Sequence, residues 1–74
     1  MIFPDENTIT KIKKEYPKGT MVELEFMDDF QAPPVGTRGI VDEVDDSGTV
    51  HVRWENGSGL GVVYGVDKVK KISD

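Results

Sequence analysis

Few side chains in this sequence could act as an acid, a base or a nucleophile. The chain has one histidine, His51, and no cysteine, and Ser47 and Ser58 both stand in glycine-containing turn sequences. A histidine base needs a nucleophile within reach and a third group that orients it. His51 occupies the polar phase of its predicted strand, and nothing in the sequence argues for such partners. We therefore expect no catalytic residue and no enzyme.

Acidic residues gather between positions 42 and 46, just before Gly48, which invites a calcium-loop interpretation. An EF-hand loop with Gly48 at its sixth position would begin at Glu43 and would need Glu at its twelfth. That position is occupied by Trp54, so the motif fails. The sequence indicates a solvent-exposed acidic turn and predicts no metal site.

Nucleotide binding and carboxylate catalysis are also disfavoured. Gly59 and Gly61 are followed by Gly65, one residue too late for GxGxxG, and no βαβ pattern surrounds them. Glu23 and Glu25 alternate along a predicted strand and are expected to face solvent together. A small barrel is filled by its own side chains, so neither glutamate gains the desolvated pocket that a general acid needs. We expect no cofactor.

Size and composition indicate one small cytoplasmic domain. The chain has 74 residues and a net charge of −5. Without disulfides, so small a domain fits a reducing compartment. No apolar run approaches the roughly 18 residues of a membrane span. The start, MIFPDENT, lacks the basic and long apolar regions of a signal peptide.

Two parts follow from the periodicity: an N-terminal arm with a short helix over residues 1–18 and a β-barrel over residues 19–72. In the arm, apolar residues recur at spacings of three and four, at Ile9, Ile12 and Tyr16. Asn7 or Thr8 is expected to cap this helix, and Pro17 to end it.

From Gly19 the apolar period changes to two, which predicts strands. Five are expected: Met21–Phe26, Thr37–Asp45, Val50–Glu55, Leu60–Tyr64 and Val66–Ile72. Turn sequences at DDSG and at Asn56-Gly57 predict hairpins, and the broken alternation near Asp42 predicts a bulge. Because curling removes sheet edges, we expect a mainly all-β fold, a five-stranded SH3-like small barrel with a short N-terminal helical arm.

Three stretches together resemble a known family: YPKGTMVELEFMDD, APPVGTRGIVDEVDDSGTVHVRWENGS and GVDKVKKI. Over roughly Tyr16 to Ile72 the chain resembles domain-of-unknown-function family 4314, a small bacterial and phage-associated family. The resemblance implies an SH3-like small barrel in cytoplasmic bacterial or mobile-element proteins. It implies no reaction and carries over no functional residue.

The remaining hypothesis is binding to a protein or peptide partner by a monomer. The Met27–Val35 loop is the longest irregular segment, and loops on rigid scaffolds are common binding sites. Its carboxylates would favour a basic residue in the ligand. The candidate partner-binding residues are Asp28, Asp29, Phe30, Pro33, Pro34, Trp54 and Tyr64. An alternative places Trp54 and Tyr64 in the core and makes Phe30 an anchor of the loop.

A rival hypothesis is a nucleic-acid-binding accessory domain that uses lysines near both ends of the chain. Its candidate residues are Lys11, Lys13, Lys14, Lys68, Lys70 and Lys71. If both lysine groups meet in the fold, they make one basic patch. The net charge of −5 disfavours nucleic acid, because affinity for phosphates comes from many lysines and arginines.

Overall fold

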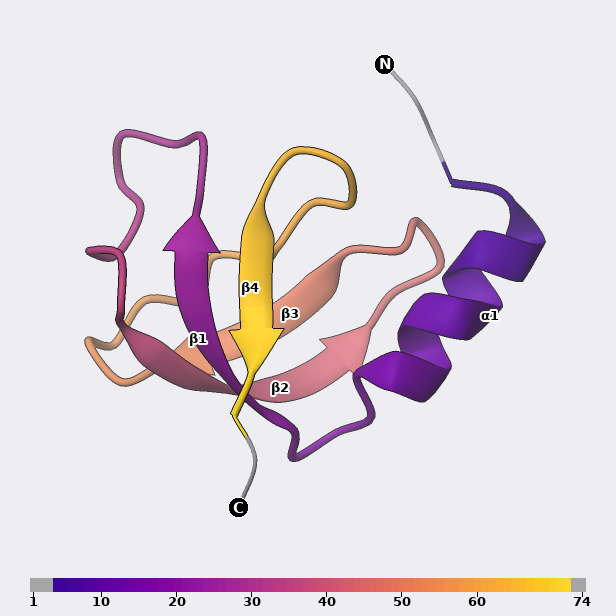
Figure 1. Ribbon diagram of the computed structural model, residues 1–74, viewed down its shortest axis with the longest axis horizontal. Helices are drawn as coiled ribbons and strands as arrows, with labels where there is room; N and C mark the ends of the chain where they lie inside the picture. The colour runs from indigo at the N-terminus through magenta and orange to yellow at the C-terminus, as the bar shows by residue number, and fades with distance from the viewer. Residues whose placement is uncertain (1–3, 73–74) are drawn as a thin grey trace.

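One antiparallel sheet and one helix make up the fold in the computed structural model, which describes residues 4–72 (Figure 1). The helix α1 spans Glu6–Glu15. The strands are β1 (Met21–Phe26), β2 (Arg38–Val44), β3 (Val50–Trp54) and β4 (Lys68–Lys71). They lie in the order β3-β2-β1-β4. The prediction of a mainly β domain with an N-terminal helix is therefore confirmed.

Helix α1 is capped by Asp5, two residues before Asn7 and three before Thr8, which were the predicted caps. The Asp5 carboxylate accepts a hydrogen bond of 2.8 Å from the Thr8 backbone N–H, which satisfies one of the free donors of the first turn. The helix stops at Tyr16 because the following proline disfavours a helical conformation there. With ten residues, this helix, which is the only one in the described part of the chain, cannot cross a membrane.

The core lies on one face of the curved sheet, closed at one side by α1. Its buried side chains are Ile12, Val22, Leu24, Val41, Val50, Val52, Trp54 and Val62. Gly39 pairs with Trp54 across β2 and β3, and a Cβ at Gly39 would come within 2.9 Å of the indole. Glycine in this strand therefore makes room for the tryptophan ring.

The predicted bulge and both predicted turns are present. Pairing between β2 and β3 shifts between Val41 and Glu43, which places the bulge at Asp42. The first turn closes with hydrogen bonds between Asp45 and Thr49 and from Gly48 to Asp45. The second brings the Trp54 N–H to the Ser58 carbonyl at 3.0 Å.

The predicted fifth strand and the closed barrel are corrected by the structure. Within residues 4–72 the sheet has four strands and is open, and from the stretch Leu60–Tyr64 only Val62 pairs, with Val50. The Leu60 carbonyl accepts the Trp54 indole N–H at 2.9 Å instead of a strand partner. Gly61 lies so close to Thr49 that a Cβ would meet its methyl group at 2.7 Å. Glycines and this side-chain bond thus interrupt the ladder.

Phe26 also departs from the predicted alternation. Pairing of β1 with β4 shifts between Leu24 and Phe26, so the strand has an irregularity at its end. The shift rotates Phe26 out of the apolar phase of Val22 and Leu24, and half of Phe26 is exposed to solvent.

Candidate functional site

The long loop between β1 and β2 is held in place by its own backbone. The Asp29 carboxylate accepts from the Gln31 N–H at 2.8 Å, and the Asp29 carbonyl accepts from the Ala32 N–H at 3.0 Å. Gly36 donates to the Leu24 carbonyl at 2.8 Å, which ties the end of the loop back to β1. Pro33 is the buried residue of this loop. These hydrogen bonds hold the conformation of the loop, which connects β1 to β2 (Figure 1).

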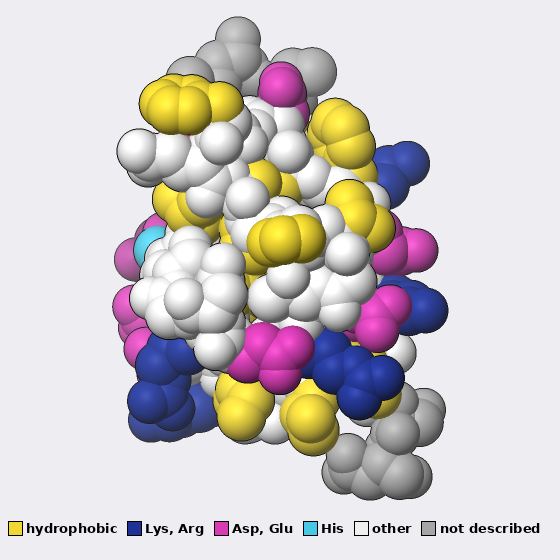
Figure 2. Space-filling model, turned by 90° about the vertical axis from the view of Figure 1, so that its left-hand side faces the viewer, with side chains coloured by type: hydrophobic (Ala, Val, Ile, Leu, Met, Phe, Trp, Pro, Cys, Tyr) yellow, Lys and Arg dark blue, Asp and Glu magenta, His cyan; other side chains and the backbone are white. Residues whose placement is uncertain are grey.

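Three apolar side chains of this region point to solvent. Phe30 is 97% exposed, Val35 is 72% exposed, and Phe26 at the end of β1 is 50% exposed. The alternative in which Phe30 anchors the loop does not agree with this exposure; the buried residue of the loop is Pro33. Figure 2, viewed from the side on which the loop lies, shows hydrophobic side chains in separate groups among acidic and basic ones. This surface offers discrete apolar anchors rather than one continuous patch.

Asp67 connects the loop to the segment that precedes β4. One of its carboxylate oxygens accepts from the Asp28 N–H at 3.0 Å, and the other accepts from the Val63 N–H at 2.9 Å. The four ion pairs among residues 4–72 leave out Asp28 and Asp29, whose side chains are exposed. These carboxylates are therefore available to a basic group of a partner.

The structure does not bring the three candidate aromatic residues, Phe30, Trp54 and Tyr64, together in one binding surface. Trp54 is 3% exposed and belongs to the core, as the alternative for this residue stated. Tyr64 is 49% exposed, but it lines a pocket with α1 and β4. Phe30 is not among the residues that line this pocket. The structure thus separates the loop from the aromatic side chains with which it was grouped.

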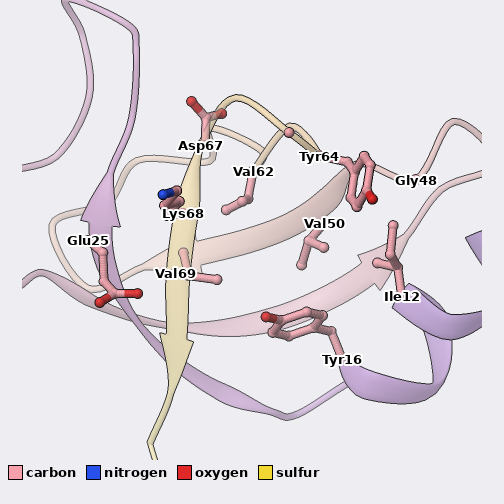
Figure 3. A pocket seen from close by; sticks show the side chains of 11 residues that line it. Ile12, Tyr16, Glu25, Gly48, Val50, Val62, Tyr64, Asp67, Lys68 and Val69 are labelled. Carbon is pink, nitrogen blue, oxygen red and sulfur yellow. The ribbon is translucent and has the colours of Figure 1, made fainter. Parts of the chain in front are cut away.

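This pocket, of about 330 Å³, lies between the outer side of β4 and helix α1 (Figure 3). Val50, Val62 and Val69 supply an apolar floor, and Tyr16 and Tyr64 form walls. Sequence reasoning missed the pocket because its residues come from four separate parts of the chain. The one sequence signal was that Tyr64 follows Val62 at a spacing of two.

Tyr16 is the pocket residue with a perturbed pKa. Burial raises the pKa of the Tyr16 hydroxyl above its ordinary value, and the negative charges of Glu15 and Glu25 add to the effect. The Lys71 ammonium lies 5.5 Å from the centre of the Tyr16 ring, within the range of a cation–π contact. The tyrosine therefore stays protonated and neutral, with one ring face near a cation.

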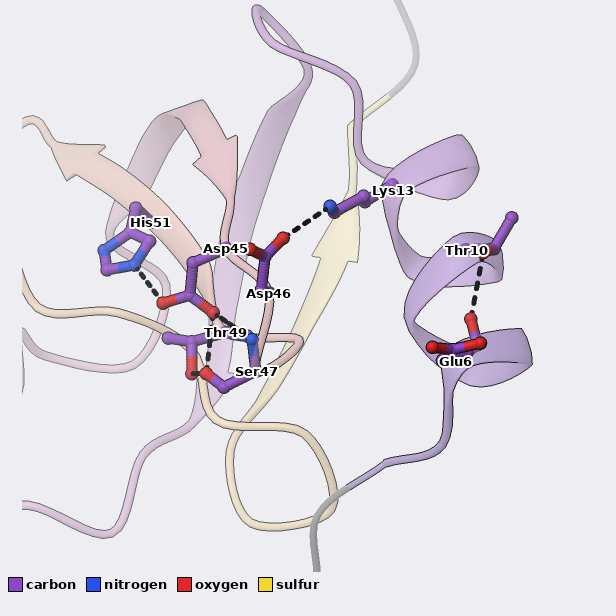
Figure 4. Close-up of polar contacts among 8 residues, drawn as sticks. All are labelled: Glu6, Thr10, Lys13, Asp45, Asp46, Ser47, Thr49 and His51. Carbon is purple, nitrogen blue, oxygen red and sulfur yellow. Dashed lines mark hydrogen bonds and ion pairs between the residues drawn. The ribbon is translucent and has the colours of Figure 1, made fainter.

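The residues closest to a hydrolase constellation form a turn (Figure 4). One oxygen of Asp45 accepts from the Ser47 hydroxyl at 2.6 Å and from the Thr49 N–H at 3.0 Å. Its other oxygen lies 2.7 Å from His51 Nε2. The hydrogen bond from Ser47, followed by that of His51, lowers the pKa of the Asp45 carboxyl well below its ordinary range. Ser47 donates to the carboxylate and not to the imidazole, so His51 is not arranged as its base.

No group of three or more His, Asp or Glu side chains in residues 4–72 is arranged to hold a metal ion. The carboxylates of the acidic turn instead accept hydrogen bonds from backbone N–H groups and pair with Lys13, whose ammonium lies 3.1 Å from Asp46 (Figure 4). Local turn bonding thus accounts for Asp45 of this acidic sequence.

The lysines of the rival hypothesis are only partly brought together. Lys71 of β4 reaches Tyr16 at the end of α1, so the two ends of the chain do meet there. Lys13 is paired with Asp46 on the acidic turn. Lys70 is paired with Glu23 at 3.3 Å, and its hydrogen bond, followed by that of Arg38, lowers the pKa of the Glu23 carboxyl. These carboxylates reduce the positive potential that a phosphate backbone would meet.

Comparison with known proteins agrees with the resemblance found in the sequence. No match to this chain was found among curated proteins or among solved structures. The family model described as "Domain of unknown function (DUF4314)" matches residues 5–72, nearly the whole described chain. The chain therefore belongs to the DUF4314 family.

Proposed function

We propose that this domain is a non-catalytic binding module that recognises a protein or peptide partner through the Met27–Val35 loop and the adjacent end of β1. The observation that carries the proposal is the 97% exposure of Phe30 on a loop held by hydrogen bonds. An aromatic side chain presented on a bonded loop loses little conformational entropy on binding. Aromatic residues are also the commonest centres of binding energy in protein interfaces.

The charges around Phe30 favour a partner with a basic residue. Asp28 and Asp29 precede it directly, and the domain carries a net charge of −5. Complementary charges steer association and contribute to specificity more than to affinity. Because the exposed apolar side chains lie in separate groups, we expect a modest affinity supported by a few anchors.

The fold also supports a module that presents loops. Val62 pairs with Val50 of β3, so a single residue pair extends the order β3-β2-β1-β4 at its β3 end. We infer that the domain is a partly open SH3-like barrel. In such a scaffold the long loop after β1 is positioned by strands on both sides.

The test is affinity capture from host-cell extract with three folded proteins: the parent, Phe30→Ala and Val63→Ala. Val63 is 45% exposed and lies outside both the loop and the pocket, so it is the matched control. A partner that uses the loop should bind Phe30→Ala about 10-fold more weakly or worse, as expected for a hot-spot residue. Its binding to Val63→Ala should stay within about twofold. If every specific partner binds Phe30→Ala as well as the parent, the proposal is wrong.

The salt dependence of binding distinguishes the nucleic-acid hypothesis from the protein-binding proposal. A labelled single-stranded oligonucleotide is titrated at low salt while backbone amide shifts are recorded. Shifts that centre on Lys11, Lys14 and Lys68 and vanish with added salt would support nucleic-acid binding, because phosphate contacts release counterions. On the protein-binding proposal no such shifts occur.

A further inference from the structure

The outer edge of β4 is the open edge of the sheet. In the order β3-β2-β1-β4, β4 is terminal, and within residues 4–72 no strand pairs with its other side. A sheet edge exposes a row of backbone N–H and C=O groups that can pair with another chain. The pocket between β4 and α1 lies along this edge (Figure 3).

The register identifies the backbone groups that face outward. Ile72 donates to the Met21 carbonyl at 2.9 Å, so these two residues form a hydrogen-bonded pair. Two residues further along β1, Glu23 is aligned with Lys70 and has the same phase. In an antiparallel pair, hydrogen-bonded and non-hydrogen-bonded residue pairs alternate. The residues between the hydrogen-bonded positions, Val69 and Lys71, therefore direct their N–H and C=O groups away from β1 and toward the open edge.

The pocket beside this edge suits one apolar side chain. Val69 points from β4 toward Val50, and Tyr16 and Tyr64 lie across the pocket from β4 (Figure 3). In a strand, alternate side chains point to the same face. A chain paired with the edge would therefore direct one side chain of every two toward the sheet face on which this pocket lies.

The lysines of β4 indicate which kind of partner strand the edge would bind. Lys68 and Lys71 lie on β4, and the four ion pairs of the described residues do not include them. Edge lysines keep neutral and basic strands from pairing and favour an acidic one. Of the pocket's own acids, Asp67 is bound by two backbone N–H groups, and Glu25 lines the pocket from β1, close enough for its charge to act on Tyr16.

We propose that an extended acidic segment of a partner protein adds as a strand to the outer edge of β4 and places one apolar side chain between Tyr16 and Tyr64. This surface is distinct from the Phe30 loop. It combines main-chain pairing, which supplies affinity, with a side-chain pocket, which supplies specificity. The added strand would occupy the end of the sheet opposite to the one at which Val62 pairs with β3.

The test uses a blocked heptapeptide, Glu-Glu-Thr-Leu-Thr-Glu-Glu, titrated into ¹⁵N-labelled protein. We expect the amides of Val69 and Lys71 to shift and to become protected from hydrogen exchange. The same peptide methylated on its backbone nitrogens, and a form with Lys in place of Glu, should each bind at least about 10-fold more weakly, since one lacks the main-chain donors and the other repels the lysines.

A matched pair of variants separates the pocket from general surface effects. Tyr64→Ala removes a pocket wall and should weaken the peptide about fivefold or more, as loss of an aromatic contact does. Phe26→Ala removes an equally exposed aromatic outside the pocket and should leave binding within about twofold. Phe30→Ala should also leave it unchanged, so failure of this proposal and failure of the loop proposal are distinguishable.

Three results would overturn the inference. The first is no shift at Val69 and Lys71 at millimolar peptide, and the second is equal binding of the methylated peptide. The third is movement of these two amides with protein concentration alone, which would show that a second copy of the chain occupies the edge.

Discussion

Asp67 is the residue whose replacement tests the structure most directly. Its two carboxylate oxygens accept hydrogen bonds from the backbone N–H groups of Asp28 and Val63. In Asp67→Asn the amide keeps one oxygen and presents an NH₂ group where the second oxygen stood. That NH₂ group faces a backbone N–H, donor against donor, so one of the two bonds is lost.

The size of the effect follows from these contacts. Hydrogen bonds to a charged group contribute about 1.5–3 kcal/mol each, and the half-buried position of Asp67 places both at the low end, near 3 kcal/mol together. Asparagine retains one neutral bond of about 1 kcal/mol. The free energy of unfolding should therefore fall by about 2 kcal/mol, which lowers Tm by roughly 8–16 °C in a domain of this size.

Urea unfolding measures this loss, and the amide exchange rates of Asp28 and Val63 locate it. Asp46→Asn is the matched control, because it removes the same charge from a fully exposed side chain whose pair with Lys13 spans 3.1 Å. Exposed pairs contribute little, so this control should change stability by less than about 0.5 kcal/mol. Equal losses in the two variants, or unchanged exchange at Asp28 and Val63 in Asp67→Asn, would refute the reasoning.

Two further variants test the turn and the core. The pKa of Asp45 is lower in the folded protein than its ordinary value, so its contribution to stability is present at neutral pH and is lost as pH falls below about 4 toward the folded pKa. Urea unfolding at several pH values should show the parent more stable than Asp45→Asn at pH 7 and the gap narrowing below pH 4; a constant gap would contradict the assignment. Trp54→Phe removes the indole N–H that satisfies the Leu60 carbonyl and leaves a small void, so unfolding in urea should show a loss of about 2–3 kcal/mol, and a loss below about 0.5 kcal/mol would show that this bond is unimportant.

Features encoded locally could be read from the sequence. The bulge at Asp42 was visible as a break in alternation, and the turn at Gly48 follows from residues that bond to their own backbone. The end of α1 at Tyr16 follows from the next residue being proline. Each of these depends on neighbours within about five positions.

Features that depend on distant contacts could not be read. Val62 stands in an alternating run that predicts a strand, but the run fails because Trp54 binds the Leu60 carbonyl and Gly61 lies against Thr49. Only the fold reveals which of two chemically similar aromatics, Trp54 and Tyr64, enters the core.

The candidate site was predicted only in part, because some of its features also depend on contacts between distant residues. Composition and length identified the Met27–Val35 loop, but they did not reveal that Phe30 is exposed while Pro33 is buried. The pocket has no local signature, because Tyr16 and Val69 are more than fifty positions apart in the chain.

The attachment of α1 has a consequence for the order in which the structure opens. Ile12 is the one buried residue of this helix, and its burial contributes about 1.5–3 kcal/mol. A ten-residue helix is marginal without such support, so α1 detaches at a lower free energy than the strands separate. Because the helix end holds Tyr16, each detachment removes one wall beside β4 while the sheet remains folded. The shape of the pocket beside β4 is therefore coupled to sub-global unfolding of one short helix.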